Sequence, residues 1–189
     1  MVFNLIDMEN WKRKEFYNHY INEVRCSYST TINIDIANLK GQKLYPAMIW
    51  LLTETVNKMS EFRTALTDEG LGLYDKLNPA YTIFNKENKN FSVIWTEFNC
   101  DYYEFLKSYE ADKAKFSSSI KLTPMTDKPM NTFDISMVPW FTFSSFIAIH
   151  KNILTLDNGG KIEIGDDENA KYRSTRIDGK GIWQPLKTH

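Results

Sequence analysis

The stretch LGLYDKLNPAYTIFNKENKNFSVIWTEF, residues 71–98, contains three short runs of aromatic and β-branched residues. The runs cover residues 71–77, 81–85 and 91–98, and polar or proline-containing segments separate them. Short runs of this composition, bounded by turn-forming residues, are typical of β-strands that follow one another in a sheet. The stretch therefore predicts an antiparallel meander of three strands.

Segments on either side of this stretch have apolar residues at helical spacing. YPAMIWLLTETVNKMS, residues 45–60, places Pro46 in its first turn, where the missing N–H of proline would have been unpaired anyway. DYYEFLKSYEADKAKF, residues 101–116, begins with Asp101, whose charge suits the N-terminal end of the helix dipole. We expect a helix in each segment, and we expect the first to be well buried.

The N-terminal region predicts two further elements. WKRKEFYNHYIN, residues 11–22, has the apolar spacing of an amphipathic helix, and Asn10 is suited to cap its start. TTINIDI, residues 30–36, alternates in the manner of a half-buried strand. Helices and strands thus follow one another without a regular βαβ order, which favours an α+β fold with a mixed or antiparallel sheet.

The C-terminal half begins with a loop rich in proline and lysine at residues 117–131. Two strand-like segments follow, FDISMVP at 133–139 and FSSFIAI at 143–149. ILTLDNGGKIEI, residues 153–164, predicts a hairpin that turns about residues 158–160, where asparagine and glycine tolerate positive φ. Beyond it the chain is charged and shows almost no apolar periodicity, so we expect an irregular tail.

The composition excludes several classes of protein. With 23 Lys and Arg against 24 Asp and Glu, the net charge is −1, and no basic stripe is present to follow a nucleic-acid backbone. No window contains the roughly 18 apolar residues of a membrane span, and the N-terminus lacks the pattern of a signal peptide. The two cysteines form no metal-binding spacing and suit a reducing compartment. We expect a cytoplasmic protein with neither nucleic acid nor membrane as partner.

Three histidines limit the acid–base chemistry available near neutral pH. His19 fits a half-buried histidine on a helix, His150 ends a strand-like run and is a candidate general base, and His189 is the last residue. Acidic pairs such as Asp68 and Glu69 lie in turn-like segments and indicate solvated charge. The chain has no glycine-rich phosphate loop, no nucleophile elbow and no calcium-loop spacing, so it predicts no metal site.

Ser136 is the remaining candidate, within SMVPWFTFSSF at residues 136–146. In a strand, its side chain would point to the face opposite those of Ile135 and Met137. From this pattern alone, the hydroxyl either lines a cavity or satisfies a backbone group.

Five blocks of the sequence, taken together, resemble the chloramphenicol acetyltransferase family. They occur in the family's order from residue 3 to residue 146, and they read FNLIDMENWKRKEFYNHY, KLYPAMIW, EFRTAL, YTIFNKENKNFSVIWTEF and NTFDISMVPWFTFSSF. The resemblance implies an α+β, two-layer fold with a mixed, largely antiparallel sheet. It also implies a homotrimer that transfers an acetyl group from acetyl-CoA to the 3-hydroxyl of chloramphenicol and so confers antibiotic resistance. Each active site then lies at a subunit interface.

The resemblance also implies roles for individual residues. Ser136 takes the position of the family's serine that donates a hydrogen bond to the tetrahedral oxyanion. The drug pocket of the family maps onto Tyr20, Cys26, Thr82 and Phe91. We therefore expect acetyl-CoA as co-substrate and chloramphenicol, or a similar small aromatic alcohol, as acceptor.

The resemblance ends at Phe146, so we divide the chain into an acetyltransferase-like domain at 1–146 and a divergent segment at 147–189. The family's H-H-x-x-x-D-G block, whose second histidine is the general base, is not found in this chain. A positioned base contributes about 100- to 10,000-fold, so we expect weak or absent activity. Three hypotheses follow: slow transfer with His150 as base, a non-catalytic binder of aromatic drugs, and a subunit of mixed trimers.

Overall fold

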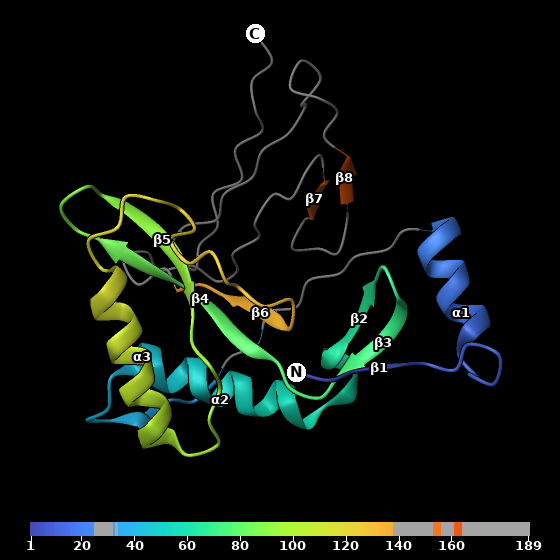
Figure 1. Ribbon diagram of the computed structural model, residues 1–189, viewed down its shortest axis with the longest axis horizontal. Helices are drawn as coiled ribbons and strands as arrows, with labels where there is room; N and C mark the ends of the chain where they lie inside the picture. Colours follow the sequence, from blue (N-terminus) through green and yellow to red (C-terminus); the bar gives the residue numbers. More distant parts are fainter. Residues whose placement is uncertain (25–31, 33, 138–152, 156–160, 164–189) are drawn as a thin grey trace, which may run out of the picture. The chain divides into compact units, whose positions relative to one another are not determined.

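The computed structural model describes residues 1–24, 32, 34–137, 153–155 and 161–163 (Figure 1). The chain divides into two compact units. The first unit consists of Met1–Lys12 and Ile36–Met137, and the second consists of Arg13–Asp35 and Val138–His189. The first unit contains most of the described secondary structure.

A three-stranded antiparallel sheet in the first unit has the order β1-β3-β2, with β1 at Phe3–Leu5, β2 at Thr64–Thr67 and β3 at Gly70–Tyr74. A short 3₁₀ helix, η3 (Ser60–Arg63), leads into β2. Gly72 lies in the central strand β3, and a Cβ atom there would come within 2.5 Å of the Phe3 ring and 2.7 Å of the Asn4 carbonyl oxygen. Only glycine fits where the backbone of β1 approaches so closely.

The second sheet of this unit has the order β5-β4-β6, with β4 at Asn78–Asn85, β5 at Asn90–Trp95 and β6 at Thr132–Ile135. Strands β4 and β5 form an antiparallel hairpin, and β6 pairs with β4 in parallel. The backbone of 120–125 runs along β5, since Val93 N–H donates to the Leu122 carbonyl at 2.6 Å. The sheet is therefore mixed, as the sequence predicts.

Two helices cover one face of this sheet, α2 at Leu44–Lys58 and α3 at Tyr102–Phe116 (Figure 1). Asp101 caps α3 as predicted, because its carboxylate accepts the N–H groups of Tyr103 and Glu104 at 2.8 and 3.1 Å. The buried core between helices and sheet comprises Ile49, Tyr81, Ile83, Ile94, Phe98, Phe105 and Tyr109. The two-layer α+β arrangement is thus confirmed for this unit.

Helix α2 is less buried than the sequence predicts. Pro46, Ala47, Ile49 and Thr53 are buried, and Pro46 lies in the first turn as expected. The opposite side of the helix is exposed, however, with 39% of Leu51 and 36% of Leu52 accessible to solvent.

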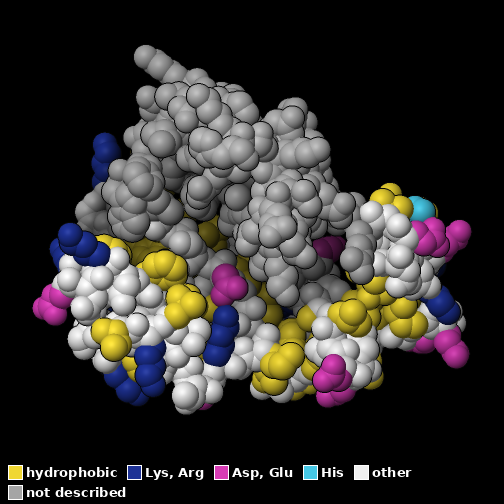
Figure 2. Space-filling view, turned by 90° about the horizontal axis from the view of Figure 1, so that it is seen from above, with side chains coloured by type: hydrophobic (Ala, Val, Ile, Leu, Met, Phe, Trp, Pro, Cys, Tyr) yellow, Lys and Arg dark blue, Asp and Glu magenta, His cyan; other side chains and the backbone are white. Residues whose placement is uncertain are grey.

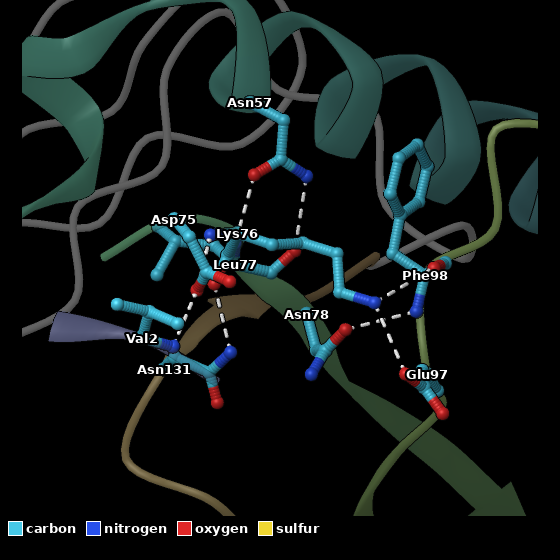
Figure 3. A network of polar contacts seen from close by, with 9 residues as sticks. All are labelled: Val2, Asn57, Asp75, Lys76, Leu77, Asn78, Glu97, Phe98 and Asn131. Carbon is cyan, nitrogen blue, oxygen red and sulfur yellow. Dashed lines mark hydrogen bonds and ion pairs between the residues drawn. The ribbon is translucent and has the colours of Figure 1, made fainter.

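The three-strand meander predicted for residues 71–98 is wrong in one respect. Strands β4 and β5 pair as expected, but β3 pairs with β1 and β2 and not with β4. Polar contacts from several other segments hold the turn between β3 and β4 (Figure 3). Asn57 of α2 accepts the Leu77 N–H at 2.8 Å and donates to the Leu77 carbonyl at 3.0 Å. These bonds stabilise the turn in which the chain passes from the β1-β3-β2 sheet to the β5-β4-β6 sheet.

The same turn is bound to the N-terminus and to the segment before β6 (Figure 3). The Val2 N–H donates to the Asp75 carboxylate at 3.0 Å. Asn131, which is buried, donates to the Lys76 carbonyl at 2.7 Å and accepts the Asn78 N–H on its backbone carbonyl at 2.8 Å. We call the contacts that Asn57 and Asn131 make with residues 76–78 the asparagine clamp.

In the N-terminal region the predicted helix is present but begins later, whereas the predicted cap by Asn10 and the predicted strand at 30–36 are wrong. Helix α1 covers only Lys14–Asn18 and continues as a π-helix, η1 (His19–Val24). Asn10 does not cap it, because the Asn10 side chain donates to Asp7 at 2.6 Å and Arg13 precedes the helix. Within 30–36, the described residues 32 and 34–36 form no strand, and the short 3₁₀ helix η2 (Ala37–Leu39) follows them. Ile32 and Ile34 are 70% and 52% exposed, so the alternating pattern has no buried side here.

The predicted hairpin at 153–164 is present as β7 (Ile153–Thr155) and β8 (Lys161–Glu163), which pair antiparallel. Its turn and the predicted strand at 143–149 lie outside the described residues. The division into 1–146 and 147–189 stays a prediction. In the part that the structure describes, no helix has both the length and the apolarity to cross a membrane.

Candidate functional site

Ser136 follows directly after the last residue of β6. The parallel pairing of β4 with β6 ends at Tyr81 and Ile135, so the next residues along the two strands are Thr82 and Ser136. Their side-chain oxygens are 3.3 Å apart, within hydrogen-bonding distance. The strand register therefore brings together two of the site residues that the family resemblance implies.

Both hydroxyls lie on the face of the sheet opposite the one that packs against α2 and α3. Along β4, Tyr81 and Ile83 are buried against α2 and α3, whereas Thr82 is half-buried and Phe84 is 49% exposed. Because side chains alternate along a strand, Thr82 and Phe84 belong to the other face. We call this surface the open face, and its residues are Thr82, Phe84, Phe91, Val93 and Ser136.

Phe91 of β5 pairs directly with Phe84 of β4 and is 51% exposed. Burial also alternates at the end of β6, where Ile135 and Met137 are half-buried and Ser136 is exposed, as the sequence pattern predicts. Hydrophobic side chains are visible at several places on the surface of the described part (Figure 2). The open face thus combines exposed aromatic rings with hydroxyl groups, the composition that suits an aromatic alcohol.

A third hydroxyl joins this pair from the first turn of α2. The Tyr45 hydroxyl lies 3.3 Å from Thr82 Oγ1 and donates to the Ile135 carbonyl at 3.4 Å. Burial raises the pKa of Tyr45, and hydrogen bonding with Thr82 offsets part of that rise. The hydroxyl is therefore protonated at neutral pH and can donate.

Sequence reasoning missed Tyr45, although it lies in the quoted block KLYPAMIW. Helical spacing predicts α2 correctly, but it gives no indication that the Tyr45 hydroxyl reaches residues 37 and 90 positions away in the chain. The only feature of the sequence that could have drawn attention to Tyr45 is its place beside Pro46 in the first turn, at the N-terminal end of the helix.

The remaining candidate residues belong to the second unit or fall outside the described residues. Tyr20 belongs to η1 in the second unit, is 50% exposed and contacts the His19 ring edge-on, with ring centroids 5.2 Å apart. Cys26 and His150 lie outside the described residues. The structure thus brings together Thr82 and Ser136 and places Phe91 on the same face.

His19 is the one histidine within the described ranges. Its Nδ1 atom is 2.7 Å from the Glu23 carboxylate, one helical turn away, and about half of its side chain is exposed. This agrees with the prediction of a helix histidine. Among the described residues, no group of three or more His, Cys, Asp or Glu side chains is placed to hold a metal ion.

Comparisons with known proteins show to which family the sequence is similar. Residues 1–158 match the family model described as chloramphenicol acetyltransferase. A chloramphenicol acetyltransferase of Staphylococcus aureus is 46% identical over 179 residues, covering 89% of this chain and 85% of the relative. One from Clostridium perfringens is 44% identical over 153 residues, covering 77% and 70%.

The fold has a counterpart among solved structures. A chloramphenicol acetyltransferase structure superposes with a TM-score of 0.58 at 21% identity, covering 78% of this chain and 75% of that one. At this level of identity the likeness concerns the fold, and it supports the α+β class predicted from the sequence.

Proposed function

This chain belongs to the chloramphenicol acetyltransferase family and is a chloramphenicol O-acetyltransferase-type protein, and we propose that its open face carries the reaction site. In this proposal the acceptor is chloramphenicol or a similar small aromatic alcohol, and acetyl-CoA is the acetyl donor. The active assembly is a homotrimer in the cytoplasm, with the site at a subunit interface.

The proposed reaction is acyl transfer from a thioester to an alcohol. The 3-hydroxyl oxygen of the drug attacks the thioester carbonyl, and the carbonyl oxygen takes the negative charge of a tetrahedral intermediate. Collapse of this intermediate releases CoA thiolate and leaves the acetyl ester, while the hydroxyl proton goes to a base. Two groups can accelerate this sequence: a donor to the oxyanion and an acceptor for the proton.

Ser136 is the proposed oxyanion donor. The observation that carries this proposal is the exposed Ser136 hydroxyl, 3.3 Å from Thr82 on the open face. A donor in this position, oriented before the reaction, stabilises charge as it develops, and losing such a donor costs about 3–4 kcal/mol in comparable sites.

The proposed drug pocket combines aromatic and small polar side chains. Thr82 and Phe91 contribute from the open face, where the exposed Phe91 ring offers a surface for the nitrophenyl group. We assign Tyr20 and Cys26 to the remainder of the pocket by family resemblance.

The proton acceptor is the weakest part of the proposed site. The family's histidine block is not found in this chain, and His150 is the candidate replacement. An alcohol is a poor nucleophile at neutral pH without a base, so we expect transfer to be about 100- to 10,000-fold slower than with a positioned histidine.

Acetyl transfer can be measured as CoA release with a thiol reagent, in the presence of added imidazole as an external base. We expect slow release that depends on chloramphenicol and rises with imidazole. Ser136→Ala should remove the imidazole-dependent increase in CoA release. It should leave drug binding, measured by calorimetry, unchanged. Drug binding without any CoA release would instead indicate the non-catalytic binder, and no binding at millimolar drug would reject the site altogether.

A further inference from the structure

Tyr45 has no part in the reaction as proposed above, yet it is hydrogen-bonded to the site. We propose that Tyr45 is a positioning residue, whose hydroxyl acts through Thr82 to orient the Ser136 hydroxyl toward the oxyanion of the intermediate. This inference rests on the proposed function of Ser136.

The three hydroxyl groups form a chain with one proton each. In one direction Ser136 donates to Thr82, Thr82 donates to Tyr45, and Tyr45 donates to the Ile135 carbonyl. In the other direction Tyr45 donates to Thr82 and Thr82 donates to Ser136, which leaves the Ser136 proton free for a new acceptor. The first direction suits the free protein, and the second is the one that an oxyanion requires.

Tyr45 can support this reversal because its oxygen has a fixed position. Its ring packs edge-on against the buried Tyr81, with ring centroids 6.3 Å apart and planes at 90°. Its hydroxyl contacts both β4 and β6 just where their pairing ends. The proton can therefore turn from Ile135 to Thr82 while the oxygen stays in place.

The contact distances indicate at which stage of the reaction the three hydrogen-bonded hydroxyls stabilise the site most. The oxygen–oxygen distances of 3.3, 3.3 and 3.4 Å exceed the usual O–H···O distance, about 2.7–2.8 Å. Hydrogen bonds to ionised partners are shorter and stronger, and bonds in a chain polarise one another. The contribution of Tyr45 thus belongs to the charged intermediate and not to binding of the neutral drug.

The test compares two ligands by calorimetry, each in the presence of CoA. One is chloramphenicol, and the other is the methylphosphonate monoester of its 3-hydroxyl, which carries anionic oxygen on a tetrahedral centre. We expect Tyr45→Phe to weaken phosphonate binding about three- to tenfold, as expected for loss of one hydrogen bond, and to leave chloramphenicol binding unchanged. In the Ser136→Ala background, Tyr45→Phe should have no further effect.

Tyr81→Phe is the matched control. The Tyr81 hydroxyl bonds Thr96 at 2.7 Å in the same core, and it does not belong to the hydrogen-bonded series of Ser136, Thr82 and Tyr45. It should leave both affinities unchanged. If Tyr45→Phe fails to fold, Thr82→Val and Thr82→Ser replace it. Because Thr82 also lines the proposed drug pocket, the ratio of phosphonate affinity to chloramphenicol affinity is then compared, and this ratio should fall in the valine variant and stay that of the wild type in the serine variant.

Three outcomes would overturn the inference alone. The first is equal phosphonate affinity in Tyr45→Phe and wild type, and the second is an equal loss of affinity for both ligands in Tyr45→Phe. The third is that Tyr45→Phe weakens phosphonate binding by the same factor in the Ser136→Ala background. If the wild type binds neither ligand at millimolar concentration, the proposed function fails together with the inference.

Discussion

Replacing Asn57 by alanine tests whether the asparagine clamp holds the two sheets of the first unit together. The Asn57 side chain makes two hydrogen bonds with Leu77, at 2.8 Å to its N–H and 3.0 Å to its carbonyl oxygen (Figure 3). Leu77 is 5% exposed, so alanine at position 57 would leave both backbone groups unpaired in a largely buried place.

The expected loss follows from these two groups. A buried donor or acceptor without a partner costs about 1–3 kcal/mol, so the two groups together should lower the free energy of unfolding of Asn57→Ala by about 2–6 kcal/mol. Asn57 lies in the last turns of α2, where alanine is the better helix former, so helix propensity cannot account for a loss. A loss of this size is a large fraction of the 5–15 kcal/mol that stabilise a typical domain.

Urea unfolding followed by far-UV circular dichroism and by tryptophan fluorescence measures this difference. Asn88→Ala is the matched control, because Asn88 is an exposed residue of the β4–β5 turn. If Asn57→Ala lies within about 0.5 kcal/mol of the control, the usual range for surface changes, the clamp does not stabilise the fold.

Two further changes test other contacts of the first unit. Gly72→Ala would place a Cβ atom 2.5 Å from the Phe3 ring and 2.7 Å from the Asn4 carbonyl oxygen, so thermal unfolding should show a loss of about 1–3 kcal/mol; an unchanged midpoint would refute the close approach of β1. The hydrogen bond from the Val2 N–H lowers the pKa of Asp75, so this carboxylate stabilises the fold above its unfolded pKa of about 3.9 and loses the effect as pH falls through the lower folded pKa. Asp75→Asn should therefore flatten the stability–pH profile between pH 4 and 2, and a profile that still parallels the wild type would contradict this assignment.

The helices and the β4–β5 hairpin could be predicted because their signals are local. Helical spacing and Asp101 identify α3, and alternating aromatic residues flank the turn of the hairpin. The partner of β3 could not be predicted, because its choice depends on Asn57 and Asn131, which lie 20 and 55 residues from the groups they bind. Strand β1 was missed for a related reason, since three residues carry too little pattern to stand out.

The candidate site shows the same division between local and non-local information. Ser136 and Thr82 follow from resemblance to a family, and their orientation on one face follows from strand alternation. Their contact depends on the parallel register of β4 and β6, which no local pattern contains. Tyr45 depends on that register too, because its hydroxyl contacts both strands at once.

This register links the stability of the fold to the geometry of the site. The parallel ladder begins where Asn78 pairs with Thr132, directly beside the bond from the Asn78 N–H to the Asn131 carbonyl. Four residues further along, the same register places Thr82 beside Ser136. A slip of one residue would turn Thr82 toward the helices and bring a core residue to the open face. The asparagine clamp therefore fixes, at one end of the ladder, which hydroxyl groups meet at the other.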